Sequence, residues 1–406
     1  MNKAPWPDFS GRDINEGDVI EHQSGERGSV VYLTTEKEPE DQWRVDYGEG
    51  SLSRLCLQIG EKEHASPAAD ETAKCCYYKT RLTKYDITCE IAPAKHSALY
   101  RFTFPASTNS HVVIDVARKI GQAVALDEGT VAIDPATGVI TGGGTYSGNW
   151  NPAPFKLFFC AKLSRKPSDV GVWKSNVVQN AATRASAAKE PLGAFARFDT
   201  KAGEVIYVKI AVSFKSQEQA GKWLDGEIPA WDFDSLQAAA KAAWTKALSA
   251  IQLEGASAEE SRRFYSNLYH TMTQPRDRTG DNGNWESSVA FYDDHYTLWD
   301  TWKTLFPLMA IISPDVVRDN VNSFIDRHNH NGYAATAFIQ GKEYKVGQGG
   351  DEVDNIIADA YVKGIEGVNW EAAYNVLRSN AESARTADYK NRGYVSFKEK
   401  HDYCGR

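Results

Sequence analysis

The stretch Phe291–Ile312, FYDDHYTLWDTWKTLFPLMAII, decides how the second half of this chain folds. Its apolar residues follow the 3.6-residue period of an amphipathic helix, at Leu298, Trp302, Leu305 and Met309. We therefore expect one continuous helix here, with an apolar face that packs into a core. Trp299 and Asp300 stand at its start, where a carboxylate meets the positive end of the helix dipole.

The Trp299–Asp300 pair also has the chemistry that a sugar pocket needs. An aromatic ring packs on the C–H face of a sugar, and a carboxylate accepts hydrogen bonds from its hydroxyl groups. The alternative is a buried aromatic helix that Asp300 only caps. Just upstream, Asp293, Asp294 and His295 form a run that we interpret as a helix cap rather than as a pocket floor.

Helical periodicity also appears on both sides of this stretch. Asp234 is placed to cap a helix over Leu236–Ile251, and Ser257 with Glu260 forms a capping box for the next helix. Three later segments have the same period, at Asp315–His328, Ile356–Ile365 and Asn369–Ala384. No strand pair is expected after residue 234, so this half of the chain is predicted to be all helical.

The preceding part of the chain has a period of two, which is typical of strands. The segments concerned are Tyr77–Leu82, Ile87–Ile91, Leu99–Phe104, His111–Val116, Phe155–Phe159 and Val205–Val212. Because no helix intervenes, they predict an antiparallel β-sandwich. We interpret Gly142–Gly144 as a hairpin turn, since the Lys-Ser/Thr pair of a phosphate-binding loop does not follow it.

Together these patterns predict two domains, as expected for 406 residues, a length that exceeds a single hydrophobic core. The predicted boundaries are 1–230 for the β-sandwich, 231–255 for a linker helix and 256–406 for the helical domain. A net charge of −8 without any basic block argues against nucleic acid as a partner. No apolar run is long enough to cross a bilayer. The six cysteines lack a Cys-x-x-Cys spacing, and we interpret them as packing thiols.

A polar loop follows Pro275 and contains Arg278, Asp281 and Trp285. These residues either line the mouth of a pocket or form surface ion pairs, and the sequence leaves both interpretations open. Trp150, shortly after the three glycines, is a second aromatic residue placed to reach toward a sugar.

Short motifs recur in a defined order along both halves of the chain. In the β half they are Tyr78–Leu82, Tyr85–Glu90, Tyr100–Pro105, Ser213–Ala220 and Glu227–Asp234. In the helical half they are Phe264–Thr271, Leu298–Trp302 and Ile357–Ile365. This ordered set covers about residues 75 to 390, and it resembles the bacterial calcium-dependent α-mannosidases of glycoside hydrolase family 92.

The resemblance implies a β-sandwich packed on an (α/α)6 barrel, of which this chain would hold the first part. It implies an exo-acting, inverting hydrolase that removes terminal α-linked mannose from glycans or mannosyl conjugates. A Ca²⁺ ion is expected to hold two hydroxyl groups of the sugar, and its ligands are not identified. Trp299 and Asp300 match the mannose-binding Trp-Asp pair of the family, which assigns Asp300 to the ring hydroxyls and Trp299 to packing.

One segment departs from the pattern of this family. In members specific for α-1,2 linkages, a Gly-Tyr-His segment shapes the leaving-group subsite. Here Gly349–Asn355 occupies that position, and we predict that Asp351 and Glu352 contact the substrate, so another linkage or a charged leaving group is expected. With Asp354, these acids also have the close oxygen ligands of a hard-cation site, and a solvated acidic loop is the alternative.

Inverting hydrolysis requires a general acid and a general base separated by enough space for a water molecule. The resemblance places both beyond Arg406, so no catalytic residue is assigned, and the remaining C-terminal polypeptide is an expected partner. Without those acids, the alternative is a non-catalytic carbohydrate-binding fragment or pseudoenzyme. An inverting glycoside phosphorylase of the same architecture is a third hypothesis, which needs a phosphate pocket that the sequence does not display.

Overall fold

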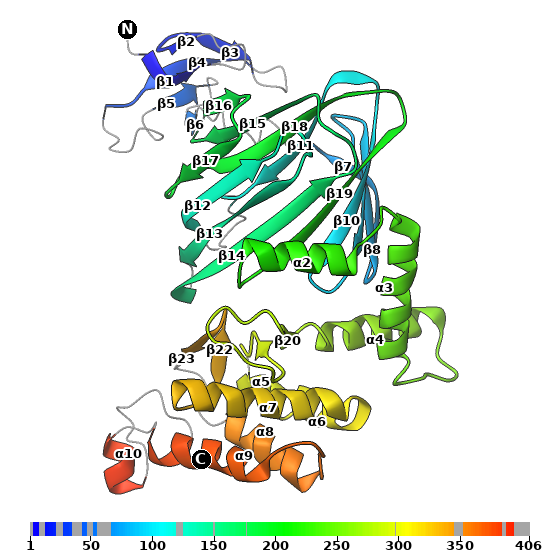
Figure 1. Cartoon of the computed structure of the whole chain (residues 1–406), viewed down its shortest axis with the longest axis vertical. Helices are drawn as coiled ribbons and strands as arrows, with labels where there is room; N and C mark the ends of the chain where they lie inside the picture. Colours follow the sequence, from blue (N-terminus) through cyan, green and yellow to red (C-terminus); the bar gives the residue numbers. More distant parts are fainter. Residues whose placement is uncertain are drawn as a thin grey trace.

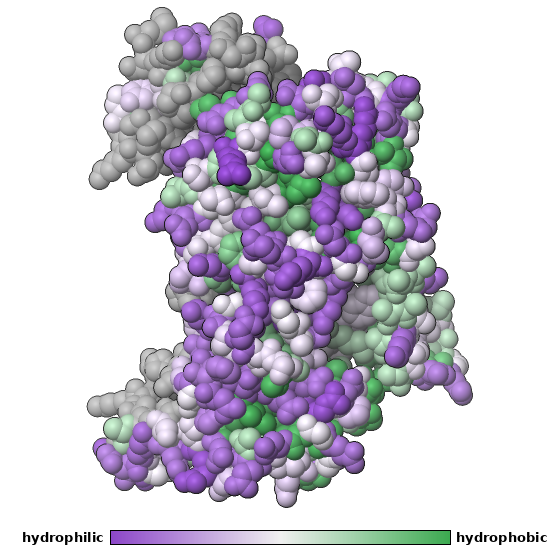
Figure 2. All heavy atoms as spheres, viewed as in Figure 1, coloured by the Kyte–Doolittle hydropathy of each residue, from purple (hydrophilic) through white to green (hydrophobic). Residues whose placement is uncertain are grey.

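The computed structural model describes residues 3–7, 13–21, 27–34, 43–46, 52–54, 66–118, 125–148, 151–175, 177–296, 298–344, 352–383 and 387–393. A strand-rich half is followed by a helical half (Figure 1). On the face shown in Figure 2, polar side chains dominate and apolar groups form small patches between them. No helix of the described part of the chain is both long and apolar enough to span a membrane.

The first strands form a small unit with a core of its own. β1 (Lys3–Pro7) pairs with β2 (Asp13–Asn15). A separate four-stranded sheet contains β3 (Val19–Glu21), β4 (Arg27–Tyr32), β5 (Trp43–Asp46) and β6 (Leu52–Arg54). Ala4, Ile14, Val30, Trp43 and Val45 are buried together in this unit. The predicted sandwich domain, 1–230, included these strands, and no separate core was predicted for them.

Two antiparallel sheets form the predicted β-sandwich. In spatial order, the nine-stranded sheet contains β17 (Arg184–Ala187), β12 (Ala125–Ile133), β13 (Ile140–Gly148), β14 (Asn151–Leu163), β19 (Glu204–Ser213), β10 (Ser97–Phe104), β9 (Ile87–Pro93), β8 (Tyr77–Leu82) and β7 (Ala68–Lys74). The four-stranded sheet contains β11 (Ser107–Asp115), β18 (Leu192–Thr200), β15 (Asp169–Lys174) and β16 (Val177–Asn180). Side chains from both sheets, such as Ile206 and Phe198, meet in one buried cluster.

The alternation of side chains explains why the strands were predictable. In β19, Ile206 and Val208 are buried in the core between the sheets, whereas Val205, which alternates with them, is exposed on the outer face. The prediction for Gly142–Gly144 was wrong, because these glycines lie within β13 and pair with β14 on one side and β12 on the other. A Cβ atom at Gly142 would lie 2.5 Å from the carbonyl oxygen of Thr130, so the close approach of β12 requires glycine there.

Two helices pack on the strand-rich half (Figure 1). α2 (Gln217–Glu227) covers part of the outer face of β14 and β19, where Leu224 packs with Cys160. α3 (Phe233–Leu248) begins after Asp232, whose side chain accepts a hydrogen bond from the backbone N–H of Ser235. The predicted cap, Asp234, was therefore wrong by two residues.

The helical half contains α4 (Ala258–Thr271), α5 (Leu298–Thr301), α6 (Leu305–Ile312), α7 (Pro314–Asn331), α8 (Glu352–Val362), α9 (Trp370–Glu382) and α10 (Ala387–Arg392). The predicted capping box of Ser257 and Glu260 is confirmed at the start of α4. Apolar residues of α5 to α9, among them Leu298, Phe324 and Ile356, form one buried cluster.

Two predictions about this half were wrong. Short antiparallel pairs do occur after residue 234, as β20 (Arg276–Asp277) with β21 (Tyr292–Asp293) and β22 (Ala337–Ile339) with β23 (Lys342–Tyr344). The single helix expected from Leu298 to Met309 is broken between α5 and α6. Pro307 explains the break, because in a continuous helix its ring would clash with the carbonyl group of Lys303. In the structure Pro307 lies in the first turn of α6, where proline is tolerated.

Candidate active site

The loop after β20 joins the helical half to the sandwich. The carboxylate of Asp281 is buried, and it accepts hydrogen bonds from Oγ of Ser213 at 2.5 Å and from the backbone N–H of Phe214 at 3.0 Å. Ser213 ends β19, so one carboxylate of the loop fixes the end of a central strand. We call Ser213, Phe214, Arg278 and Asp281 the domain junction.

Arg278 is the cation of the domain junction. Its guanidinium lies on the Phe214 ring, 3.4 Å from the ring centre, and forms an ion pair with the buried Asp293. It also donates a hydrogen bond to the carbonyl oxygen of Asp281 at 3.0 Å. Burial raises the pKa of the Asp293 carboxyl, and the charge of Arg278 opposes that rise. A single side chain therefore connects the sandwich to the strand that leads into α5.

Asp293 and His295 are internal anchors. Asp293 also accepts a hydrogen bond from the backbone N–H of Gly341 at 3.2 Å. His295 pairs with Phe338 through two backbone hydrogen bonds of 2.9 Å, and its Nε2 donates to Oδ1 of Asn320 at 2.7 Å. The interpretation of this run as a helix cap was therefore wrong, because both side chains are buried in extended backbone.

The His295 imidazole is neutral at physiological pH. Complete burial, together with the nearby charge of Arg327, lowers its pKa to about 3. Nδ1 of His295 lies 3.5 Å from Nη1 of Arg327, so the ring faces a cation on one side and an amide oxygen on the other. This arrangement fixes the tautomer with the proton on Nε2, and it makes His295 a poor acid or base for catalysis.

Trp299 and Asp300 lie on α5, a single helical turn that follows this anchored strand. Trp299 is half-buried, with its ring centre 6.1 Å from that of Tyr296. Asp300 is exposed, and within the described part of the chain its carboxylate has no hydrogen bond or ion pair. Asp300 therefore does not cap α5, and its carboxylate is free to accept hydrogen bonds from a ligand beside an aromatic ring.

The acidic segment before α8 is described only in part. Asp351 lies outside the described residues, as does Trp150. Glu352 begins α8, is 7% exposed, and accepts a hydrogen bond from Oγ1 of Thr336. Asp354 accepts a hydrogen bond from Nδ2 of Asn380 at 2.7 Å. The structure therefore places Glu352 inside the protein rather than on an open loop.

Trp299–Asp300 and the start of α8 belong to one packed region. Leu298, beside Trp299, shares a buried cluster with Val353 and Ile356 of α8. Because α5 contacts α8, the two segments predicted to bind the substrate lie near each other. Their side chains differ, since the carboxylate of Asp300 is open and that of Glu352 is internal.

The most deeply buried ion pair of this region joins two residues that were not predicted as part of the site. Arg327 is fully buried and donates two hydrogen bonds to the carboxylate of Glu343, at 2.8 and 2.5 Å. Its guanidinium lies 4.2 Å from the centre of the Phe338 ring. Arg327 lies in α7 and Glu343 in β23, so no local sequence pattern indicated their pairing.

The polar loop after Pro275 was predicted either to line the mouth of a pocket or to form surface ion pairs, and its residues behave differently from one another. Arg278 and Asp281 are buried at the domain junction, so surface ion pairing was the wrong interpretation for them. Trp285 is half-buried, donates from Nε1 to Asp326 at 2.7 Å and stacks on His330. The rim of the loop carries an exposed ion pair with the sandwich, between Lys215 and Glu286.

The donor set in the described residues does not form a metal centre. Within the ranges given above, no group of three or more His, Cys, Asp and Glu side chains is arranged to hold an ion. Cys75, Cys76, Cys89 and Cys160 are free thiols, and the other two cysteines lie outside the described residues. The described residues therefore do not fit a complete calcium site.

Comparisons with known proteins match the two halves separately. The model described as "Glycosyl hydrolase family 92 N-terminal domain" matches residues 51–213, and that described as "Glycosyl hydrolase family 92 catalytic domain" matches residues 219–405. An uncharacterized secreted glycosidase of Arthroderma benhamiae is 26% identical over an alignment of 360 residues, and the match covers 81% of this chain and 42% of the relative.

Solved structures of family GH92 proteins match most of this chain. A family GH92 α-mannosidase from Bacteroides thetaiotaomicron, in complex with mannoimidazole, matches with a TM-score of 0.73 and 25% identity, over 82% of this chain and 46% of that one. A family GH92 inverting mannosidase from the same species has a TM-score of 0.72 and 21% identity, over 95% and 51% of the two chains. The chain thus spans about half the length of the relatives it matches.

Proposed function

Because the chain belongs to glycosyl hydrolase family 92, we propose that it acts as an α-mannosidase on terminal α-linked mannose of glycans or mannosyl conjugates. The observation that carries this proposal is the match of both halves, in order, to the two domains of that family. A structural neighbour that binds mannoimidazole supports mannose as the sugar. The finer parts of the proposal are exo action, inversion and assistance by calcium.

Trp299 and Asp300 are the proposed contacts to the terminal sugar. The exposed carboxylate of Asp300 accepts hydrogen bonds from ring hydroxyls, and the half-buried indole of Trp299 packs against the sugar. α5 follows a strand that Arg278 and Asp293 fix to the domain junction. This attachment supports a role in holding the sugar near the sandwich.

Inversion requires an acid that protonates the leaving oxygen and a base that activates a water on the opposite face of the sugar. We assign neither role to a described residue, since His295 is held neutral and Glu352 and Asp293 are internal. Calcium enters the proposal through the family resemblance alone. Because the described residues do not fit a complete site, we assign no ligand and derive no step through the ion.

Hydrolysis of an aryl α-mannoside tests the proposal directly. We expect activity that is higher in calcium than in a chelator, and NMR of the first product formed should detect the β-anomer that inversion requires. Asp300→Ala should lower kcat/KM by about 10- to 100-fold, the value of one hydrogen bond to a charged group. Glu366→Ala, which removes an exposed acid elsewhere in the helical half, is the matched control.

Each alternative gives a different result in this assay. Binding of mannose without turnover in any condition would support the carbohydrate-binding alternative. Phosphate-dependent release of mannose 1-phosphate would support the phosphorylase hypothesis. Wild-type kcat/KM in Asp300→Ala would remove the assignment of Asp300 while leaving the activity itself in place.

A further inference from the structure

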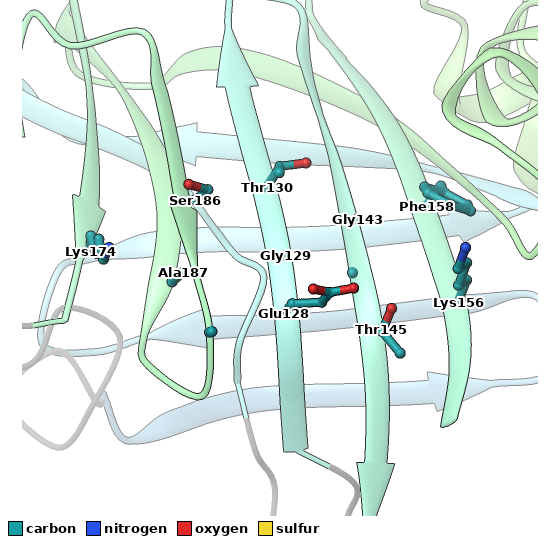
Figure 3. Close-up of a pocket in the computed structure, with 12 residues that line it drawn as sticks. Glu128, Gly129, Thr130, Gly143, Thr145, Lys156, Phe158, Lys174, Ser186 and Ala187 are labelled. Carbon is teal, nitrogen blue, oxygen red and sulfur yellow. The ribbon is translucent and has the colours of Figure 1, made fainter. Parts of the chain in front are cut away.

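The outer face of the nine-stranded sheet carries a broad hollow that the proposed active site does not use. α2 packs mainly on β14 and β19, and the residues that line the hollow come mostly from β17, β12, β13 and β14 (Figure 3). The hollow has a volume of about 620 Å³ and extends over all four strands from β17 to β14. Its lining is polar except for the Phe158 ring and small residues.

Strand register aligns the side chains of the hollow in two rows. Ser186, Thr130, Gly143 and Phe158 lie opposite one another on successive strands. Glu128, Thr145 and Lys156 form the neighbouring row. Residues two apart in a strand share a face, so both rows point to the same side of the sheet. Lys174 stands at the far edge (Figure 3).

Glycine keeps the middle of the hollow open. A Cβ atom at Gly143 would lie 2.5 Å from the carbonyl oxygen of Leu157 and 2.8 Å from Cδ1 of Phe158. The Phe158 ring therefore leans across Gly143, where any larger residue would push it away. Phe158 is half-buried, and the part of its ring that remains open faces the hollow.

The chemistry of this surface matches a sugar chain. Hydroxyl groups of Thr130, Thr145 and Ser186 both donate and accept hydrogen bonds, as sugar hydroxyls do. A carboxylate and an ammonium group, from Glu128 and Lys156, add stronger acceptors and donors at the ends of the second row. The one aromatic ring provides an apolar platform. Phe158 is the one large apolar side chain among the lining residues, so an acyl chain or an apolar peptide would find a single apolar contact there.

The first row leads toward the domain junction. Phe158 lies opposite Ser213, whose Oγ donates to Asp281 of the helical half. At about 4.8 Å per strand, Ser186 and Ser213 are about 19 Å apart across the sheet. Ser213 is fully buried, so a chain of several sugars along the row would end at Phe158, one strand from the junction.

We propose that this hollow binds the inner sugars of a mannose-rich glycan whose terminal mannose enters the active site. The inference rests on the proposed function for the identity of the sugar. It adds a binding surface on the sandwich that is distinct from Trp299 and Asp300. Short substrates do not reach the hollow, so its contribution appears only with extended glycans.

Affinity for soluble α-mannan, measured by gel retardation, tests the proposal. Phe158→Leu should weaken mannan binding about fivefold, and Phe158→Tyr, which keeps the ring, should retain it. Because Phe158 is half-buried, the exposed double variant Thr130→Ala/Lys156→Ala gives a second measurement with the same expected loss. Lys241→Ala, an exposed lysine on α3, is the control.

Kinetics on a small substrate separate this proposal from the proposed function. KM for an aryl α-mannoside should be unchanged in the hollow variants, while KM for mannan rises. Unchanged mannan affinity in both variants, or no binding of mannan by the wild type, would overturn the hollow as a glycan site. A third outcome is that the wild type binds mannan but does not hydrolyse the aryl α-mannoside, and that the hollow variants lose the mannan binding. This result would support the hollow as a glycan site and would contradict the proposed mannosidase activity.

Discussion

The guanidinium of Arg278 lies 3.4 Å from the centre of the Phe214 ring, and its other side pairs with the buried carboxylate of Asp293. Phe214 follows the last strand of the sandwich, and Asp293 belongs to the strand before α5. The Arg278 side chain therefore contacts both halves of the molecule.

Arg278→Met should lower the free energy of unfolding by about 3–5 kcal/mol, because it leaves Asp293 buried without its counter-ion. Urea unfolding at pH 7 measures the change. Arg276→Met is the matched control, since Arg276 is largely exposed and its ion pair with Asp294 contributes at most about 1 kcal/mol. Equal effects of the two substitutions would contradict the role given to Arg278.

The lowered pKa of His295 should make the free energy of unfolding depend on pH. Its pKa of about 3 in the folded protein lies below the ordinary value near 6.5, so below pH 6.5 the unfolded chain binds a proton that the folded chain excludes. The contribution of His295 to the free energy of unfolding is greatest above pH 6.5, and it decreases as the pH falls toward 3. Between pH 7 and pH 5 the loss is about 2 kcal/mol.

Urea unfolding of His295→Gln at pH 7 and at pH 5 checks this dependence. The variant should be less stable at pH 7 and should lose about 2 kcal/mol less than the wild type on acidification. His270→Gln replaces an exposed histidine and should keep the wild-type dependence. The same loss in wild type and His295→Gln would show that other groups cause the acid sensitivity.

Trp299 predicts a change in recognition without a large change in folding. Trp299→Ala should lower kcat/KM for an aryl α-mannoside about tenfold, and Trp299→Phe should lose less because it keeps a ring. Thermal unfolding of each variant accompanies the kinetics, since the side chain is half-buried. If Trp299→Phe were as impaired as Trp299→Ala, ring packing would not be the function of this residue.

The sandwich core requires glycine at position 193. A Cβ atom at Gly193 would lie 2.0 Å from the ring of Trp173, which is 1% exposed, so Gly193→Ala should destabilise the protein by about 1–3 kcal/mol. Gly226→Ala is the matched control, because Gly226 is in α2 and a Cβ atom there meets no neighbour within 4 Å. That change should stabilise the helix by about 0.5–1 kcal/mol. Urea unfolding compares the two, and a neutral Gly193→Ala would contradict the packing described.

Local patterns in the sequence predicted most of the fold. Tyr77–Leu82 was predicted as a strand and forms β8 with the same bounds, because alternation and turn residues act over a few positions. The capping box of Ser257 and Glu260 was predictable for the same reason. The break before α6 was missed although its cause, Pro307, is local. The apolar residues keep a helical period across the break, so periodicity alone does not reveal it.

The candidate site was predictable only where its chemistry is local. Trp299 and Asp300 are adjacent in sequence, so an aromatic ring beside an acid can be recognised without a structure. Arg278 with Phe214, and Arg327 with Glu343, are pairs that the folded chain creates from separate elements. Nothing in the sequence distinguishes these arginines from surface arginines, because burial decides their role.

The break between α5 and α6 also bears on how this protein can evolve. Phe306 and Met309 of α6 are buried in the helical core, whereas Asp300 of α5 is exposed and has no side-chain partner among the described residues. In one continuous helix, a change in the exposed turn would alter the orientation of the residues that follow it. With the helix interrupted, a substitution at Asp300 can change what this turn contacts while Phe306 and Met309 stay packed beneath it.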